Sequence, residues 1–81
     1  MARYYFDLLD DGNSAVDEEG LELSGLRAVQ AEAAKALADM ARDAVHSSDG
    51  LTKRHMAIEV RDESGPVMQV RFNFEVERLK Q

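Results

Sequence analysis

Residues 56–76 read MAIEVRDESGPVMQVRFNFEV, two alternating apolar runs separated by a turn. Apolar side chains stand at every second position of 56–60 and of 68–76, the period of a strand with one buried face. The intervening residues 62–66, DESGP, are turn formers, with Gly and Pro side by side. The stretch therefore predicts a β-hairpin with one apolar face, while its opposite face carries polar and charged residues.

Upstream of this hairpin, an amphipathic helix is predicted from Gly25 to His46, with Ser24 as its N-cap. No Pro interrupts this interval. Steps of 100° per residue place one apolar stripe along the helix, which we expect to face the core. Its members are Leu26, Val29, Ala33, Ala36, Leu37, Met40 and Ala44. Such a helix covers the apolar face of the hairpin.

A second apolar strip of the predicted helix lies beside the core stripe and consists of small residues. We take it as the candidate partner-binding surface. Its members are Ala31, Ala34, Ala38, Ala41 and Val45. Small side chains at this spacing let another helix or strand approach closely. Alanine also stabilises a helix without any partner, so a purely structural role stays open.

The chain begins with a further strand, predicted over residues 3–9, RYYFDLL, with its even-numbered residues facing the core. Residues 10–13, DDGN, are predicted to turn, because these residue types tolerate a positive φ. A short extended piece around residues 15–16 and a second turn at residues 17–20, DEEG, lead to the helix.

These elements predict one α+β domain over residues 1–81, in the order β-(short β)-α-β-β. We expect a three-stranded, mainly antiparallel sheet with one helix packed on one face. The last strand is expected between the first strand and its own hairpin partner, because all neighbours are then antiparallel and the helix makes a right-handed crossover. Such a sheet has two open edges, which pairing with a second subunit would cover.

All of the formal net charge of −6 arises in the first 23 residues, where the acidic side chains oppose Arg3 alone. An acidic chain binds phosphate backbones poorly, because that affinity depends on Lys and Arg. Nucleic-acid binding through the open sheet face, near Arg61 and Arg71, is therefore only a third interpretation. The acidic segment instead favours contact with a basic or cationic partner.

The lack of cysteine and of a long apolar run indicates the cellular compartment. The chain has no cysteine, which fits a reducing compartment. It also has no apolar run of the roughly 20 residues that a membrane span requires, and its N-terminus turns polar at Asp7. We expect a soluble, cytoplasmic protein with no membrane partner.

The weak candidates for metal ligands are Asp10, Asp11, Asp17, Glu18 and Glu19. Hard cations such as Ca²⁺ take several carboxylate or carbonyl oxygens from one loop. Counted from Asp11, however, the EF-hand spacing fails, because Ala15 stands at the fifth position and Val16 at the sixth. We therefore expect no cofactor and keep metal binding as an alternative.

Candidates for catalysis are few. The closest grouping of a base, hydroxyls and an acid is His46 to Asp49, at the predicted end of the helix. Ser and Asp at such a place are typical of a helix-ending turn. Nucleophilic catalysis needs a hydroxyl or thiol beside an oriented base, and no second grouping offers one. We expect no catalytic residue.

The chain resembles a family of short bacterial domains of unknown function, found in proteobacteria of soil and root nodules. The likeness is carried by residues 3–8, RYYFDL, by residues 10–12, by residues 17–23, DEEGLEL, and by the first half of the helix. The hairpin matches more loosely. The resemblance implies no activity, cofactor or site residue.

Together these observations predict a small non-catalytic protein-interaction or regulatory module, which we expect to form a homodimer. The alternative is a metal-dependent or metal-binding protein that uses the acidic N-terminal turns. Binding of nucleic acid through the open sheet face is the third possibility.

Overall fold

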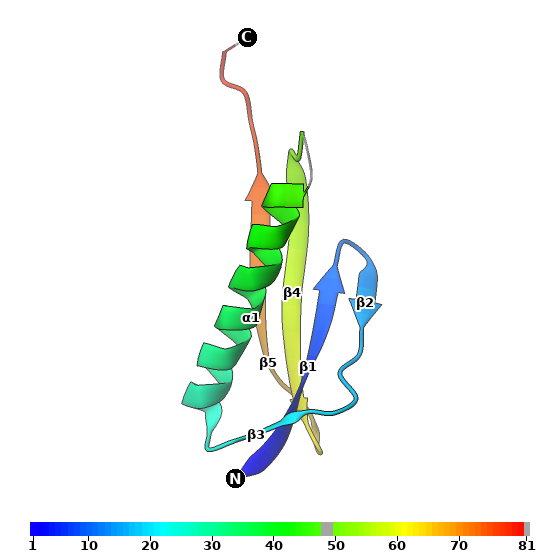
Figure 1. The fold of residues 1–81 in the computed structure, drawn as a ribbon, viewed down its shortest axis with the longest axis vertical. Helices are drawn as coiled ribbons and strands as arrows, with labels where there is room; N and C mark the ends of the chain where they lie inside the picture. Colours follow the sequence, from blue (N-terminus) through cyan, green and yellow to red (C-terminus); the bar gives the residue numbers. More distant parts are fainter. Residues whose placement is uncertain (48–49, 81) are drawn as a thin grey trace.

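The computed structural model describes residues 1–47 and 50–80 and has an α+β fold, with one helix packed on an open antiparallel sheet (Figure 1). The elements, in chain order, are β1 (Ala2–Asp10), β2 (Asn13–Ala15), β3 (Leu21–Leu23), α1 (Leu26–Ser47), β4 (Lys53–Asp62) and β5 (Gly65–Glu75). Within the described residues, no helix is both long and apolar enough to cross a bilayer.

The sheet has five strands, so the prediction of three is wrong. Its main path runs β2-β1-β4-β5, and β3 also pairs with β1. β2 and β3 have three residues each, too few for alternation to reveal them. The extended piece near residue 15 was expected, but Leu21–Leu23 was interpreted only as an approach to the helix.

The predicted strand order is also wrong, because β1 pairs with β4 and β5 lies at the edge. All pairings are antiparallel. The reason is the path between β1 and α1: β2 and β3 carry the chain back to the starting end of β1 before the helix begins (Figure 1). The helix then runs in the direction of β1, so β4 enters antiparallel to β1 and pairs with it directly.

The turn between β1 and β2 has the predicted chemistry. Asp11 has φ 47° and Gly12 has φ 91°, and Asp10 pairs with Asn13 across them. Two central residues with positive φ form the type I′ turn, which matches the twist of a hairpin. The β4–β5 hairpin is also confirmed, with a register shift at Val60 and Arg61.

The core lies between α1 and the β4–β5 side of the sheet. Its fully buried side chains include Val29, Ala33, Ile58 and Val60, all predicted to be buried. Burial of the valine and isoleucine side chains stabilises the fold by about 1.5–3 kcal/mol each, and burial of the Ala33 methyl group by less. Leu26 was also expected in the core, but it is 54% exposed.

Residues at the ends of the predicted core stripes are more exposed than predicted. Val76, like Leu26, is half exposed, because it lies beyond the last residue of β5. The helix begins one residue later than predicted, and the N–H of Val29 donates to the carbonyl of Gly25 at 3.1 Å. Gly25, not Ser24, therefore stands at the N-cap, since the N-cap carbonyl accepts the first helical bond.

Candidate functional site

The acidic turn at residues 17–20 is built around the Asp17 side chain. One carboxylate oxygen accepts from the N–H of Phe6 in β1 at 3.1 Å. The other accepts from the N–H groups of Glu19 at 3.1 Å and Gly20 at 3.2 Å. Asp17 is an Asx-type turn residue that is also fixed to the neighbouring strand. Its two oxygens are thus committed to the backbone of the same chain.

Arg61 of β4 joins this turn to the open face of the sheet. Its Nε donates to Asp7 at 2.9 Å, and its Nη2 donates to the carbonyl of Asp17 at 2.9 Å. Asp7 also accepts from the N–H of Asp17 at 2.9 Å. The guanidinium lies over the ring of Tyr5, 4.6 Å from its centre, in a cation–π arrangement. We call Tyr5, Asp7, Asp17 and Arg61 the Asp17 cluster.

The electrostatics of the Asp17 cluster favour ionised side chains. Partial burial acts to raise the pKa of Asp17, but hydrogen bonds from the backbone of Phe6, Gly20 and Glu19, with the charge of Arg61, outweigh it and lower the pKa. The bond to Asp7 is the main cause of a raised pKa at Arg61. A carboxyl whose pKa is lowered is a poor general acid near neutral pH.

Gly20 fits into this cluster because it has no side chain. Its φ is +73°, and a Cβ there would lie 2.9 Å from the side chains of both Arg3 and Tyr5. Only glycine adopts such a conformation readily and permits so close an approach. In the DEEG segment, Asp17 and Gly20 therefore have a structural role: they fix the turn that leads from β2 to β3.

A second ion pair joins the tip of β1 to β4. Arg54 donates to both carboxylate oxygens of Asp10 at 2.8 Å, a bidentate geometry. The hydrogen bond from Arg54 is the largest cause of the lowered pKa of Asp10. Asp11 accepts from the N–H of His55 at 3.1 Å and lies 3.5 Å from the Arg54 Nε. Both acids of the first turn thus bind β4.

The five candidate metal ligands do not converge. Asp10, Asp11 and Asp17 contact protein donors, while Glu18 and Glu19 are exposed. Across the described part of the chain there is no group of three or more His, Asp or Glu side chains arranged to hold a metal ion. A cation would have to compete with Arg54 and with backbone N–H groups for these oxygens.

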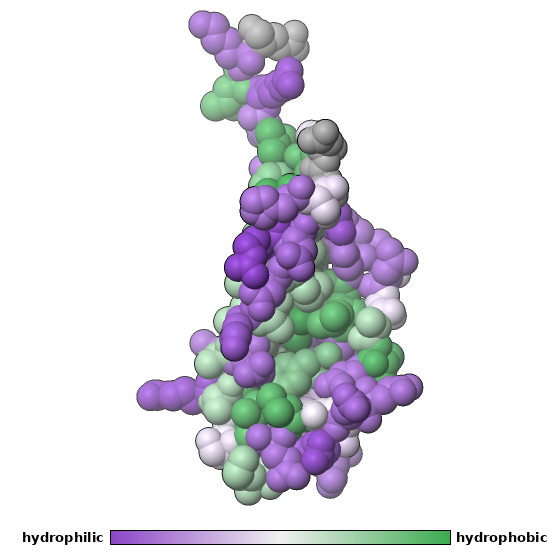
Figure 2. Space-filling view, viewed as in Figure 1, coloured by the Kyte–Doolittle hydropathy of each residue, from purple (hydrophilic) through white to green (hydrophobic). Residues whose placement is uncertain are grey.

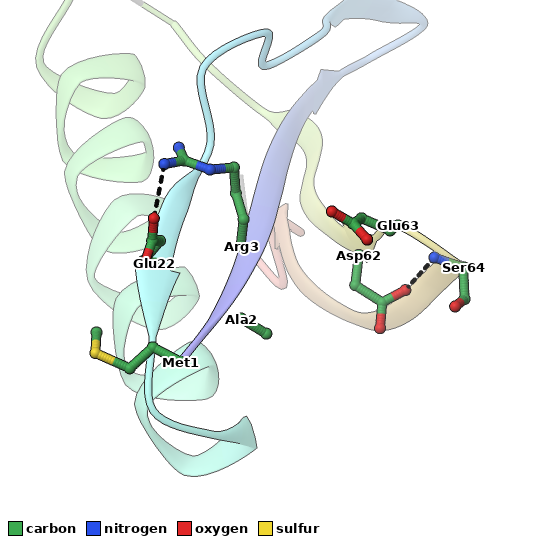
Figure 3. A pocket seen from close by; sticks show the side chains of 7 residues that line it. All are labelled: Met1, Ala2, Arg3, Glu22, Asp62, Glu63 and Ser64. Atoms are coloured by element: carbon green, nitrogen blue, oxygen red, sulfur yellow. Dashed lines mark hydrogen bonds and ion pairs between the residues drawn. The ribbon is translucent and has the colours of Figure 1, made fainter.

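The described surface is hollowed near both ends of β1. The larger hollow, of about 490 Å³, is at the N-terminal end of β1, beside the β4–β5 turn (Figure 3). Arg3 pairs with Glu22 at 3.0 Å on one side, and Asp62 accepts from the N–H of Ser64 at 2.7 Å on the other. No histidine lines it, and the Asp62 carboxylate binds the backbone N–H of Ser64, so the hollow holds no serine–histidine pair for nucleophilic catalysis.

The second hollow, of about 410 Å³, lies at the β1–β2 turn end of the open sheet face. His55 and Asn73 line it, with 2.9 Å between the His55 Nδ1 and the Asn73 Oδ1. The hollow contains no Ser, Thr or Cys. The other grouping considered from sequence, at the end of α1, includes Ser48 and Asp49, which lie outside the described residues.

The open sheet face does not combine free bases with aromatic rings. Its outward aromatic residue, Tyr5, is already covered by Arg61, and Arg61 is paired with Asp7. Arg71 is exposed on β5. Stacking of nucleic-acid bases needs uncovered aromatic faces. The arrangement gives no support to that function.

The predicted small-residue strip lies on the surface of α1, and we call it the α1 flank. Ala31, Ala34, Ala38 and Val45 are exposed, whereas Ala41 is half-buried and packs against the core. Figure 2 shows polar side chains along the front of the helix, with apolar surface beside them. The flank is therefore accessible in a single chain.

The side of the molecule on which the α1 flank lies follows from helix handedness. The last turns of α1 run upward in front of β4 and β5, with β5 on the left and β1 on the right (Figure 1). In a right-handed helix seen this way, residues about 100° beyond the buried row point left. The flank thus lies on the β5 side of the helix, away from β1.

A family model, described as a domain of unknown function (DUF6894), matches residues 3–73. The chain belongs to this family. No curated protein matches the sequence, and no solved structure matches it. The resemblance noted from the sequence is thus confirmed as membership of a family of unknown function, and the match carries no activity to this chain.

Sequence reasoning missed the partners of the acidic side chains. Asp17 was predicted as a turn residue and a weak candidate metal ligand, and Arg61 as a base of the open sheet face, but their pairing with each other and with Asp7 was not predicted. Arg61 is 54 positions from Asp7 and 44 from Asp17, so no local pattern signals these contacts. The only sequence hint is that the DEEG segment ends in a glycine beside an aromatic strand.

Proposed function

We propose that this DUF6894 domain is a small non-catalytic protein-interaction or regulatory module that contacts protein through the α1 flank. The observation that carries the proposal is the exposure of Ala31, Ala34, Ala38 and Val45 in one row on a well-packed helix. Small apolar side chains let a second backbone approach closely, and their burial loses little side-chain entropy.

The remaining surface favours this proposal over the metal-dependent and nucleic-acid alternatives. The carboxylates of Asp10 and Asp17 accept hydrogen bonds from other groups of the chain. Neither of the two hollows contains a nucleophilic side chain that is oriented by a histidine. The metal-dependent alternative would need those carboxylates free, and the nucleic-acid alternative would need uncovered aromatic and basic groups. Neither has a specific observation in its favour.

The proposal is tested by site-specific photocrosslinking. A photoreactive amino acid placed at Ala38 is expected to form an adduct with another protein chain, either a second copy or a different protein. The same probe at Glu63, in the distant β4–β5 turn, is the control and is expected to form none. If Ala38 gives no more adduct than Glu63, in purified protein and in the native cell extract alike, the proposal is wrong.

A further inference from the structure

The long outer strand β5 is the open edge of the sheet. β5 has 11 residues and pairs with β4 on one side, and no strand of the described chain lies on its other side. Its one proline, Pro66, stands at the beginning and leaves the rest of the edge able to donate. Long open edges are templates for pairing with another strand.

The residues that point their backbone groups outward can be identified from one hydrogen bond. The N–H of Val76 donates to the carbonyl of Thr52 in the β4 direction at 2.8 Å. Backbone groups alternate in direction along a strand, so the even-numbered residues from 70 to 76 face β4. The N–H and C=O groups of Gln69, Arg71, Asn73 and Glu75 therefore face outward.

The opposite edge of the sheet consists of two short strands instead of one long one. β2 pairs with residues 8–10 of β1, and β3 pairs with residues 2–4. Between them, the N–H of Phe6 donates to Asp17. The two edges thus differ in length, and among the described strands β5 offers the long continuous row of free backbone groups.

We propose that β5 pairs antiparallel with β5 of a second copy of this chain, about a two-fold axis through Asn73. This inference rests on the proposed function, because it names the partner and the register of an interaction made on the same side of the molecule. The result is one continuous antiparallel sheet across two subunits. Main-chain bonds supply the affinity in such strand addition.

Charge complementarity among the residues of β5, which ends at Glu75, selects the register. With the axis at Asn73, Arg71 stands opposite the partner's Glu75, and the symmetry gives this pair twice. With the axis at Arg71, two arginines would face each other, which is destabilising. With the axis at Phe72, Arg71 would face asparagine and no ion pair would form.

The same register brings the apolar residues on the helix side of β5 into contact. Phe72 then stands opposite the partner's Phe74, and Val70 opposite the partner's Val76. Phe72 and Phe74 stack within one chain at 6.3 Å and are only half-buried, while Val76 is 48% exposed. Cross-strand aromatic pairs stabilise a sheet more than an alanine pair does. Pairing would therefore cover apolar surface that a single chain leaves open.

The α1 flank fits the same arrangement. The last turns of α1 lie over β4 and β5, so a β5–β5 junction separates the two helices by two strand spacings, or roughly 10 Å. Helices in contact lie about 8–10 Å apart, and small side chains favour the close end of that range. Ala38, Ala41 and Val45 belong to these turns and face the partner's helix.

The distribution of charge is compatible with two copies. The acidic excess lies in residues 1–23, which form β1, β2 and β3 on the side of the sheet away from β5. Pairing at β5 keeps the two acidic segments at opposite ends of the joined sheet. Their repulsion is then screened by salt, since the Debye length is about 10 Å at 0.1 M.

Two measurements on the full chain test the proposal. Sedimentation velocity over a range of concentrations is expected to show reversible formation of a dimer. Amide hydrogen exchange at dimer concentrations is expected to slow at Arg71, Asn73 and Glu75, whose amides are open in one chain. A monomer at the highest concentration, or a dimer in which these amides stay open, overturns the proposal.

Matched variants separate pairing from folding. Asn73→Pro removes one outward N–H and is expected to abolish the dimer, whereas Asn73→Ala keeps that N–H and loses only the contact with His55. Arg71→Glu is expected to raise the dissociation constant at least tenfold, and Arg71→Glu combined with Glu75→Arg to restore it. Circular dichroism of each variant checks folding. A folded Asn73→Pro variant that still dimerises overturns the proposal.

The outcome also distinguishes this inference from the proposed function. If the chain stays monomeric but Ala38 crosslinks to a different protein, the interaction module stands and the β5 dimer is wrong. If the chain is monomeric and Ala38 forms no adduct, both are wrong.

Discussion

The Asp17 side chain accepts a backbone hydrogen bond at the outer edge of β1, as a neighbouring strand would do. Its carboxylate accepts the N–H of Phe6 in the gap between the residues that β2 and β3 pair, and it also holds the turn that leads from one short strand to the other. A buried or half-buried N–H without a partner costs free energy. At the residue scale, the acidic signature of the N-terminus is thus largely structural.

The first prediction concerns this side chain. Asp17→Ala leaves the N–H groups of Phe6 and Gly20 without their acceptor, so we expect a loss of about 2 kcal/mol in the free energy of unfolding. Urea unfolding measures it. Glu18→Ala, at the exposed neighbour, is the control and is expected to change stability by less than about 0.5 kcal/mol. Equal losses in the two variants would contradict the structural role of Asp17.

The second prediction compares two glycines that share a positive φ. Gly20→Ala adds a Cβ at 2.9 Å from the side chains of Arg3 and Tyr5, whereas Gly12→Ala adds one with nothing within 4 Å. Both substitutions carry backbone strain of about 1 kcal/mol or more. We expect Gly20→Ala to be the more destabilising, in thermal unfolding, because only there does steric contact add to strain. The reverse order would show that the turn adapts freely.

The third prediction follows from the lowered pKa values of Asp10 and Asp17. A carboxyl whose pKa is lower in the folded than in the unfolded chain stabilises the fold above the unfolded value, which is about 3.9 for Asp. That contribution is lost as the pH falls through the folded value. We expect the free energy of unfolding to decline below about pH 5 and more steeply below the unfolded value.

The matched variant for this pH dependence carries Asp10→Asn and Asp17→Asn. It is expected to be less stable than the natural sequence at pH 7 and to lose less stability between pH 6 and pH 3. Urea titrations at several pH values measure both curves. Parallel curves would mean that acid acts through other carboxyls.

At the scale of elements, α1 and the β4–β5 hairpin were predictable because each spans enough residues for its period to emerge. Ile58 and Val29, for example, fall on stripes that the sequence marks as apolar, and both are fully buried. β3 could not be predicted, since Leu21–Leu23 is too short for alternation and forms only because β1 lies beside it. The predicted strand order was wrong for the same reason. The pairings of β2 and β3 with β1 decide at which end of the sheet the helix starts.

The fourth prediction tests how α1 is oriented. Ala33 is fully buried, whereas Ala38 is exposed on the α1 flank. Ala33→Arg forces a charge into the core and is expected to prevent folding. Ala38→Arg is expected to alter the free energy of unfolding of the single chain by less than about 0.5 kcal/mol, because arginine is also a good helix former. Circular dichroism and urea unfolding distinguish the two, and a large loss from Ala38→Arg would mean that the flank is part of the core.

At the scale of the whole molecule, a single helix covers only part of a sheet. α1 contacts β4 and β5, and side chains such as Phe6, Leu8 and Phe72 remain half-buried. A chain of this size removes only about 60% of its unfolded surface from water, so its stability as a monomer is modest. The candidate site was predictable only as a row of small residues on a helix. Its position beside the open β5 edge depends on the strand order, which the sequence does not reveal.

The last prediction concerns how pairing at the open β5 edge affects the thermal stability of a chain with a small core. If two copies pair through β5, association stabilises the folded state by mass action, and the melting temperature depends on protein concentration. We expect the melting temperature to rise as concentration increases from the micromolar to the millimolar range, measured by differential scanning calorimetry. The Asn73→Pro variant lacks one outward N–H at the two-fold axis and is expected to melt at one temperature throughout, while Asn73→Ala follows the natural sequence. A melting temperature that is independent of concentration in all three proteins would mean that the folded chain is stable alone, with β5 as an unpaired edge.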